Sequence, residues 1–183
     1  MPSREEYLRQ PVIEHVRRLG RTGSELAAAI DGRDPDALGR RPDPHSWSPA
    51  EIVCHLRDVE ELFRIRFHTI LALDDPKILT LSAEPADLAA WGIGGPVGNP
   101  LDPDRWAEEL QYARSDPSRA LDAFRRRRSE TLALLNSLTD AQWLRGGIHP
   151  QRGRLNLGDW VASLASHDDN HLDQLKRALD GRP

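Results

Sequence analysis

The amino-acid sequence predicts an all-α protein in which four long helices form a bundle. Four long segments carry apolar residues at alternating three- and four-residue steps, the spacing that places them on one face of a helix. No segment alternates apolar and polar residues strongly enough to predict a strand. A long glycine- and proline-rich stretch, 77–103, separates the second helical segment from the third, and four helices with one long crossover are typical of a bundle.

The first long helix is predicted from Pro11 to Ile30. Residues 31–32, Asp-Gly, follow it and are typical of a helix end. An apolar stripe at helical spacing predicts that one face of this helix is buried in a core. The stripe consists of Val12, Val16, Leu19, Gly23, Leu26 and Ile30.

The second long helix has the clearest start signal in the sequence. Residues 48–51, Ser-Pro-Ala-Glu, form a capping box with proline at the first helical position. Trp47 precedes this box and could pack back as a hydrophobic staple. The helix is expected to end near Leu73, because residues 74–76, Asp-Asp-Pro, cannot continue it.

The remaining chain is predicted to contain two more long helices and several short elements. The stretch 77–103 is expected to be a loop, and loops of this length often lie at a functional rim. Four consecutive arginines, 125–128, lack interleaved aromatic residues and are interpreted as a solvated helix face. The other expected elements are a short helix over 104–112, a third long helix that opens at 116–117, a capped turn at 139–143, a hairpin-like polar turn at 146–156 and a fourth long helix over about 157–180.

Composition and length limit the class of protein. The chain has 183 residues, which fits a single domain spanning residues 1–183. A formal net charge of −4 does not indicate a protein that binds nucleic acid or a membrane surface. The N-terminal residues lack the apolar core of a signal peptide, and no stretch approaches the roughly 18 apolar residues of a membrane span. With one cysteine, Cys54, no internal disulfide can form, and we expect a cytoplasmic location.

Two histidines in the fourth long helix have the spacing of metal ligands. His167 and His171 stand four residues apart, so both imidazoles project from one helix face, about 6 Å apart at the backbone. Two ring nitrogens can then reach one ion at roughly 2.1 Å. The pair interrupts the apolar stripe of its helix, and burying two imidazoles without partners costs about 1–3 kcal/mol each, which a shared metal would offset. Taken alone, the spacing also occurs by chance on solvated faces.

A third histidine extends the pair to a set of three. His55 lies on the apolar side of the second long helix, between Ile52 and Val59. Alone, it would be interpreted as a core histidine bonded to a carbonyl or carboxylate. Together with His167 and His171 it predicts a three-histidine metal site, and three protein ligands leave a coordination position open, as in catalytic sites.

Carboxylates and a further histidine lie near the predicted ligands in the sequence. Asp168 falls on the inward stripe, so it is the candidate to orient a ligand imidazole or to accept a proton. Asp58 and Asp169 are interpreted as solvated or ion-paired with arginine. His149, in the turn before the fourth helix, could reach the mouth of the site, whereas His15 is interpreted as a surface residue.

Two sequence motifs resemble those of the DinB-like superfamily. Residues 47–60, Trp-Ser-Pro-Ala-Glu-Ile-Val-Cys-His-Leu-Arg-Asp-Val-Glu, resemble its second-helix motif. Residues 167–175, His-Asp-Asp-Asn-His-Leu-Asp-Gln-Leu, resemble its last-helix motif, and residues 153–158 are similar to the segment that leads into that helix. The motifs occur in the same order as in the family, and the resemblance covers nearly the whole chain.

The resemblance implies a fold, a cofactor and a range of activities. The fold is a four-helix bundle of the up-down-down-up type, usually a homodimer. The cofactor is a divalent metal ion (zinc, nickel, iron or manganese) held by the residues that match His55, His167 and His171. The superfamily includes transferases that use low-molecular-weight thiols such as bacillithiol or mycothiol, and members described as metal-dependent hydrolases. The stretch 77–103 is longer than the usual family connection, so substrates cannot be carried over from relatives.

These observations leave two main functional hypotheses. The first is a metal-dependent transferase or hydrolase that acts on a small-molecule substrate, with no nucleic-acid or membrane partner. The alternative is a non-catalytic, metal-stabilised dimer that binds a small molecule or acts in a stress response. A third interpretation is a helical protein whose buried histidines are purely structural.

Overall fold

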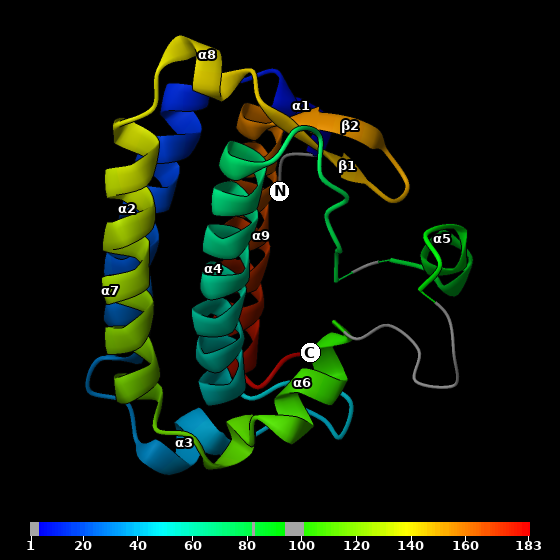
Figure 1. The fold of residues 1–183 in the computed structure, drawn as a ribbon. Helices are drawn as coiled ribbons and strands as arrows, with labels where there is room; N and C mark the ends of the chain where they lie inside the picture. The colour runs from blue at the N-terminus through cyan, green and yellow to red at the C-terminus, as the bar shows by residue number, and fades with distance from the viewer. Residues whose placement is uncertain (1–3, 82, 94–100) are drawn as a thin grey trace.

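In the computed structural model, which describes residues 4–81, 83–93 and 101–183, four long helices form a bundle (Figure 1). They are α2 (Val12–Ile30), α4 (Pro49–Ala72), α7 (Pro117–Asn136) and α9 (Leu157–Leu179). Helix α4 packs against α7 and α9, and α2 packs against the same two helices. The predicted all-α four-helix bundle is therefore confirmed, with the long helices at the expected places in the chain.

Short elements connect and cap the long helices. A 3₁₀ turn, η1, follows α6, and the two strands form one antiparallel hairpin. The short elements are α1 (Arg4–Leu8), α3 (Pro35–Gly39), α5 (Pro85–Ala90), α6 (Pro103–Glu109), η1 (Tyr112–Arg114), α8 (Asp140–Trp143), β1 (Gly146–His149) and β2 (Gly153–Asn156).

The direction of the helices explains the long crossover. Figure 1 shows α2 and α9 running from the hairpin end of the bundle to the α3 end, and α4 and α7 running the opposite way. Because α4 and α7 are neighbours that run in the same direction, the chain must return along the whole bundle between them. The stretch 77–103 forms most of that return.

Helix starts agree with the capping signals in the sequence. The Ser48 hydroxyl accepts a hydrogen bond from the Glu51 amide, and the Glu51 carboxylate accepts one from the Ser48 amide. Asn156 and Asp159 exchange the equivalent pair of bonds at the start of α9. Each cap satisfies amide groups that the first helical turn leaves without partners, so α4 and α9 begin at fixed residues.

The segment 146–156, expected to be a hairpin-like polar turn, forms a two-stranded antiparallel hairpin, although no strand was predicted from alternation. Strands β1 and β2 pair with Gly146 opposite Asn156 and His149 opposite Gly153. Ile148 also holds the start of the crossover, because the Ile78 amide donates to its carbonyl at 2.9 Å. A side chain at position 147 could not fit, since a Cβ there would lie 2.6 Å from Ile78 Cγ1. Four-residue strands that contain glycines lack the alternation that predicts strands from sequence.

The stretch 77–103, expected to be a loop, contains a short helix. Pro85 occupies the first turn of α5, where its fixed φ and missing amide are tolerated. The helix is six residues long and keeps Leu88 buried. Residues 94–100, the glycine-rich part for which no helix was expected, lie outside the described residues.

The apolar core has two parts that meet near the middle of α4 and α9. One part includes Ile52, Leu56 and Leu172. The other includes Val59 and Ala165. His167 and His171 fall between Ala165 of one cluster and Leu172 of the other, and His55 lies beside Leu56 of the first cluster, one turn before Val59 of the second.

Two expectations about surface residues are wrong. Arg128 is only 4% exposed, although residues 125–128 were expected on a solvated face. It lies four residues after Phe124 and three before Thr131, and this spacing places all three on the inward face of α7. His15 is only 2% exposed, because its ring stacks on Tyr7 of α1, a helix that the periodicity did not predict.

No helix in the described part of the chain is long and apolar enough to cross a membrane.

Candidate metal centre

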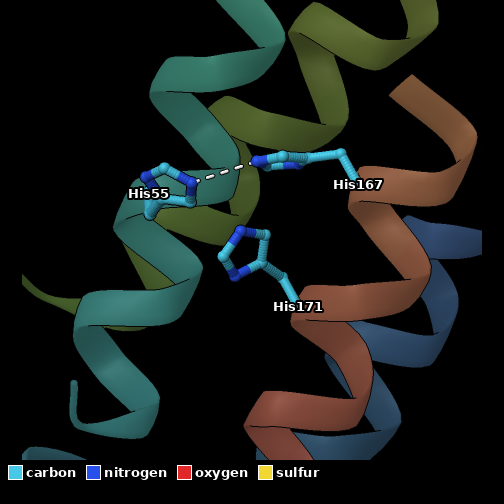
Figure 2. A group of neighbouring side chains, drawn as sticks. All are labelled: His55, His167 and His171. Carbon is cyan, nitrogen blue, oxygen red and sulfur yellow. Dashed lines mark hydrogen bonds between the residues drawn. The ribbon is translucent and has the colours of Figure 1, made fainter. Parts of the chain in front are cut away.

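Helices α4 and α9 bring three histidines together. His55 comes from the second turn of α4, and His167 and His171 come from successive turns of α9 (Figure 2). The three rings point toward one another across the space between the two helices. The residues predicted to form a metal site from their spacing are therefore neighbours in the structure.

The distances between the imidazoles fit a single ion. Nε2 of His55 and Nε2 of His167 are 3.1 Å apart, and one nitrogen from each of the three residues lies within 4.8 Å of the other two. Two nitrogens that bind one ion at roughly 2.1 Å are separated by about 3–3.5 Å in tetrahedral or octahedral geometry. Small rotations of the rings are therefore enough for all three to reach one ion.

Burial keeps the imidazoles neutral, which is the state in which they bind a metal. It holds the pKa of His55 and the pKa of His167 well below the ordinary histidine value, and the other imidazoles lower both further. Burial also lowers the pKa of His171, although a hydrogen bond to Gln174 opposes this effect. Protonating all three would place several like charges together, which disfavours the protonated cluster and leaves ring nitrogens with lone pairs.

Gln174 fixes the orientation of His171. Its side-chain Oε1 lies 2.7 Å from Nδ1 of His171, so Nδ1 carries the proton and donates to Gln174. The lone pair is then on Nε2, the nitrogen free to bind an ion. Nδ1 of His55 and Nδ1 of His167 are buried with no partner among the described residues. Sequence reasoning did not single out Gln174, although it lies three residues after His171 on the same helix face.

Trp47 forms an aromatic wall beside the histidines. Its ring is nearly parallel to that of His171, with centroids 6.3 Å apart, and its centroid lies 4.7 Å from that of His55. The indole Nε1 donates a hydrogen bond to Asp104 of α6 at 3.1 Å. The residue expected to act as a hydrophobic staple for α4 thus packs against two of the three imidazoles.

The histidines line a cavity of about 450 Å³. Its other walls include Leu81 and Pro103 from the two ends of the crossover, together with Gln174. A second cavity of about 600 Å³ shares His45, Trp47 and Asp104 with the first, so the two cavities adjoin at these residues. Another cavity, of about 890 Å³, lies between the end of α2 and the start of α7, and its lining includes none of the three histidines.

Asp168 makes contacts other than those expected of it. Its carboxylate accepts hydrogen bonds from the guanidinium of Arg128 and the hydroxyl of Thr22, and no imidazole of the described chain donates to it. The cavity lining does not include Asp168. The group that orients an imidazole through a direct hydrogen bond is Gln174.

The other residues considered from the sequence lie outside the cluster. Asp58 pairs with arginines, and so does Asp169, as expected. His149 packs against Trp160 and is not part of the cavity lining. His45, which the sequence did not single out, does line the cavity. Cys54 is fully buried, and burial raises the pKa of its thiol, as expected for an inert core cysteine.

The donor set fits a divalent metal ion. Among the described residues, this group of possible ligand atoms has three members, one ring nitrogen from each of the three histidines. The three imidazoles are neutral and face a common point. Imidazole suits several divalent ions, including zinc, nickel and iron. A three-residue ligand set in a cavity leaves room for a non-protein ligand.

Comparisons with known proteins agree with the four-helix-bundle fold. The sequence profile of the DinB superfamily matches residues 18–175. YfiT of Bacillus subtilis (strain 168), which is named as a metal-dependent hydrolase, is 24% identical over 180 residues, covering 96% of this chain and 90% of YfiT. The solved structure of YfiT, described as an unusual four-helix bundle, superposes with a TM-score of 0.74 over 97% of this chain and 88% of that one, at 22% identity. Since the profile spans most of the sequence, including α4, α7 and most of α2 and α9, the chain belongs to the DinB superfamily.

Proposed function

We propose that this protein is a metal-dependent enzyme in which His55, His167 and His171 hold a divalent ion at the base of a substrate cavity. The observation that carries the proposal is the convergence of three neutral imidazoles on a cavity of about 450 Å³. His55 is buried and His167 and His171 are half-buried, and uncharged histidines that open into a cavity in this way are typical of catalytic rather than structural metal sites.

A bound divalent ion would supply Lewis-acid activation, which lowers the pKa of a coordinated water or thiol toward neutrality. The protein's own residues would orient the reactants. Trp47 offers a flat apolar surface against which a substrate can pack, and Gln174 keeps the lone pair of His171 directed into the cavity. Apolar walls from the crossover would exclude water from the reacting groups.

Proton transfer would fall to groups at the cavity wall. Asp168 was expected either to orient a ligand imidazole or to accept a proton, but its oxygens accept hydrogen bonds from Arg128 and Thr22. Apart from the three histidines, the ionisable groups that line the described part of the cavity are His45 and Asp104. We therefore propose His45 and Asp104 as the proton-transfer candidates.

Two reaction classes fit this site. Hydrolysis follows if water is activated, and it is the activity for which the relative YfiT is named. Transfer of a low-molecular-weight thiol follows if a thiolate is activated, because divalent ions with open positions also bind thiolates. Both classes place a small-molecule substrate in the cavity. We also propose that the protein forms a homodimer, which sedimentation equilibrium would test.

Metal analysis tests the proposal directly. Protein produced without a polyhistidine tag should contain about one divalent ion per chain, and the identity of the ion follows from the same elemental analysis. The double variant His167→Ala/His171→Ala should lose the ion. His68→Ala is the matched control, because His68 is exposed on α4 and outside the cluster. Equal metal content in all three proteins would overturn the assignment.

Activity screening separates the enzyme from a non-catalytic module. The metal-loaded protein should hydrolyse members of a panel of esters, amides and lactones, or join thiols to electrophiles. Activity should disappear in the double variant and remain in His68→Ala. Full metal occupancy without turnover of either panel would favour a metal-stabilised small-molecule-binding protein.

A further inference from the structure

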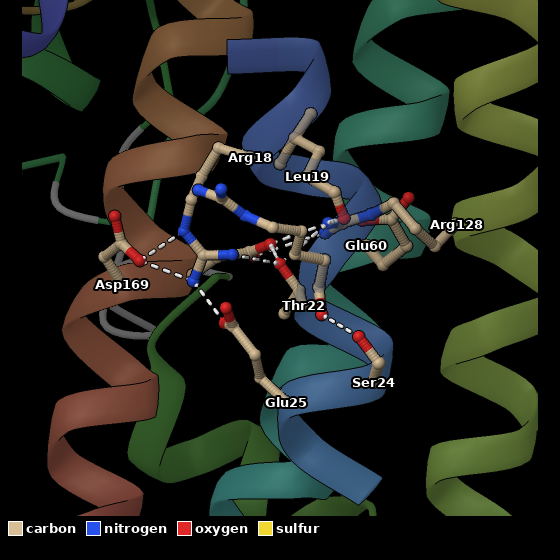
Figure 3. A network of polar contacts seen from close by, with 10 residues as sticks. Arg18, Leu19, Thr22, Ser24, Glu25, Glu60, Arg128 and Asp169 are labelled. Carbon is tan, nitrogen blue, oxygen red and sulfur yellow. Dashed lines mark hydrogen bonds and ion pairs between the residues drawn. The ribbon is translucent and has the colours of Figure 1, made fainter. Parts of the chain in front are cut away.

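A buried arginine in α7 contacts all three other long helices (Figure 3). Arg128 donates to the Leu19 carbonyl of α2 at 2.8 Å, to the Glu60 carboxylate of α4 at 2.6 and 2.9 Å, and to the Asp168 carboxylate of α9 at 2.6 and 3.2 Å. The exposed fractions of Arg128, Glu60 and Asp168 are 4%, 0% and 1%. These hydrogen bonds from Arg128 to Leu19, Glu60 and Asp168, here called the Arg128 tie, are therefore directional contacts inside an otherwise apolar core.

The tie joins the two helices that carry the histidines. Asp168 directly follows His167 on α9, and Glu60 lies five residues after His55 on α4, a rise of about 7.5 Å along the helix. The position of α4 relative to α9 determines whether Nε2 of His55 and Nε2 of His167 stay 3.1 Å apart. A group that bridges Glu60 and Asp168 therefore also controls the spacing of the ligands.

The chemistry of the contact is suited to this control. Apolar packing is non-directional, so apolar contacts alone only weakly restrict how far one helix is shifted along the axis of another. A guanidinium offers donors in a rigid planar fork, which fixes the positions of both carboxylates. The Thr22 hydroxyl adds a donor to Asp168 at 2.5 Å, which further restricts the carboxylate.

Stability alone does not account for the tie. Removing three charged groups from water is costly, and replacing a buried ion network by apolar residues is often neutral or stabilising. Glu60 Oε1 has no hydrogen-bond partner among the described residues, so the network is not fully satisfied. Its value to the protein must then include the geometry that it imposes.

We propose that Arg128 is a positioning residue for the metal centre, which acts through Glu60 and Asp168 to set the spacing between His55 and the α9 histidines. This inference rests on the proposed metal-binding function. It assigns Asp168 a role in holding α9 in place rather than in proton transfer.

The test compares cobalt binding by wild type and Arg128→Lys. Lysine keeps the positive charge but lacks the planar fork, so it cannot bridge both carboxylates as arginine does. We expect Arg128→Lys to bind Co²⁺ roughly tenfold or more weakly, within the range found when outer contacts of metal sites are removed. We also expect altered positions and intensities of the cobalt d–d absorption bands, which report coordination geometry.

Leu135→Ala is the matched control for loss of stability. Leu135 is buried on the same helix but belongs to the apolar core and makes no part of the tie. It should lower the melting temperature while leaving cobalt affinity and the d–d bands unchanged. A destabilising change that merely loosens the core would affect both variants alike.

Glu60→Gln provides a second variant if Arg128→Lys does not fold. It keeps the shape of the side chain but removes the charge that holds one arm of the tie, so a smaller shift in the same direction is expected. Wild-type affinity and bands in the folded variants would overturn the positioning role alone. A wild-type protein that binds no cobalt would overturn the proposed function, and the positioning role with it.

Discussion

Replacing Gln174 tests how the metal centre is tuned. In Gln174→Ala, Nδ1 of His171 loses its acceptor at 2.7 Å, and the ring is no longer restricted to the orientation and tautomer that leave Nε2 free. Loss of such an outer contact typically weakens metal binding 10- to 100-fold, which corresponds to about 1.4–2.8 kcal/mol. Gln174 is half-buried on the surface of α9, so the substitution should leave the fold intact.

The matched variant is Gln174→Glu. A carboxylate at this position accepts the same bond from His171 Nδ1 and makes the imidazole a stronger base, so affinity should equal or exceed that of wild type. Zinc affinity is measured by competition with a chromophoric chelator near neutral pH, and the melting temperature of the metal-free proteins reports folding. The reasoning is refuted if Gln174→Ala binds zinc as tightly as wild type, or if Gln174→Glu weakens binding as much as alanine does.

Three further predictions concern pH, capping and the aromatic wall. Burial lowers the pKa of His167 below the value of about 6.5 that it has in the unfolded chain. The melting temperature of the metal-free protein should therefore stay constant above about pH 6.5 and decrease as the pH falls below that value. The decrease should be smaller in His167→Gln. Ser48→Ala removes the α4 cap, so the free energy of unfolding should decrease by about 1 kcal/mol. In thermal unfolding, the melting temperature should decrease by about 2–4 °C. Since the Trp47 and His55 rings lie 4.7 Å apart, Ni²⁺ or Cu²⁺ should quench tryptophan emission, and Trp47→Phe should abolish most of that quenching.

The sequence alone was sufficient to predict the bundle and the cluster of three histidines. Periodicity and capping residues act over a few neighbouring positions, so α4 and α9 could be located from local patterns. The histidine spacing within α9 is local in the same sense. The place of His55 on an apolar stripe predicted that it faces His167 and His171, and the structure confirms this prediction.

The features that were missed depend on contacts between distant residues. Strand β1 is stabilised by pairing with β2 and with the start of the crossover, which no local pattern encodes. Asp168 has several donors within reach, and only the packing of α2 and α7 decides that Thr22 and Arg128 bind it. Arg128 could have been recognised, because it continues the inward stripe of α7, but its place in a run of arginines suggested a solvated face.

Hydrogen bonds hold the crossover at both of its ends. The cavity walls that the crossover forms are therefore separate from the long helices that carry the histidines. Ile78 is bonded to β1 at one end, and Asp104 receives the Trp47 indole at the other. Between these anchors lie Leu81 and Pro103, which form cavity walls, whereas the three histidines belong to the long helices. Changes in this part of the chain can therefore alter what fits beside the histidines without disturbing them, so that related proteins can diverge in substrate while they keep one chemical centre.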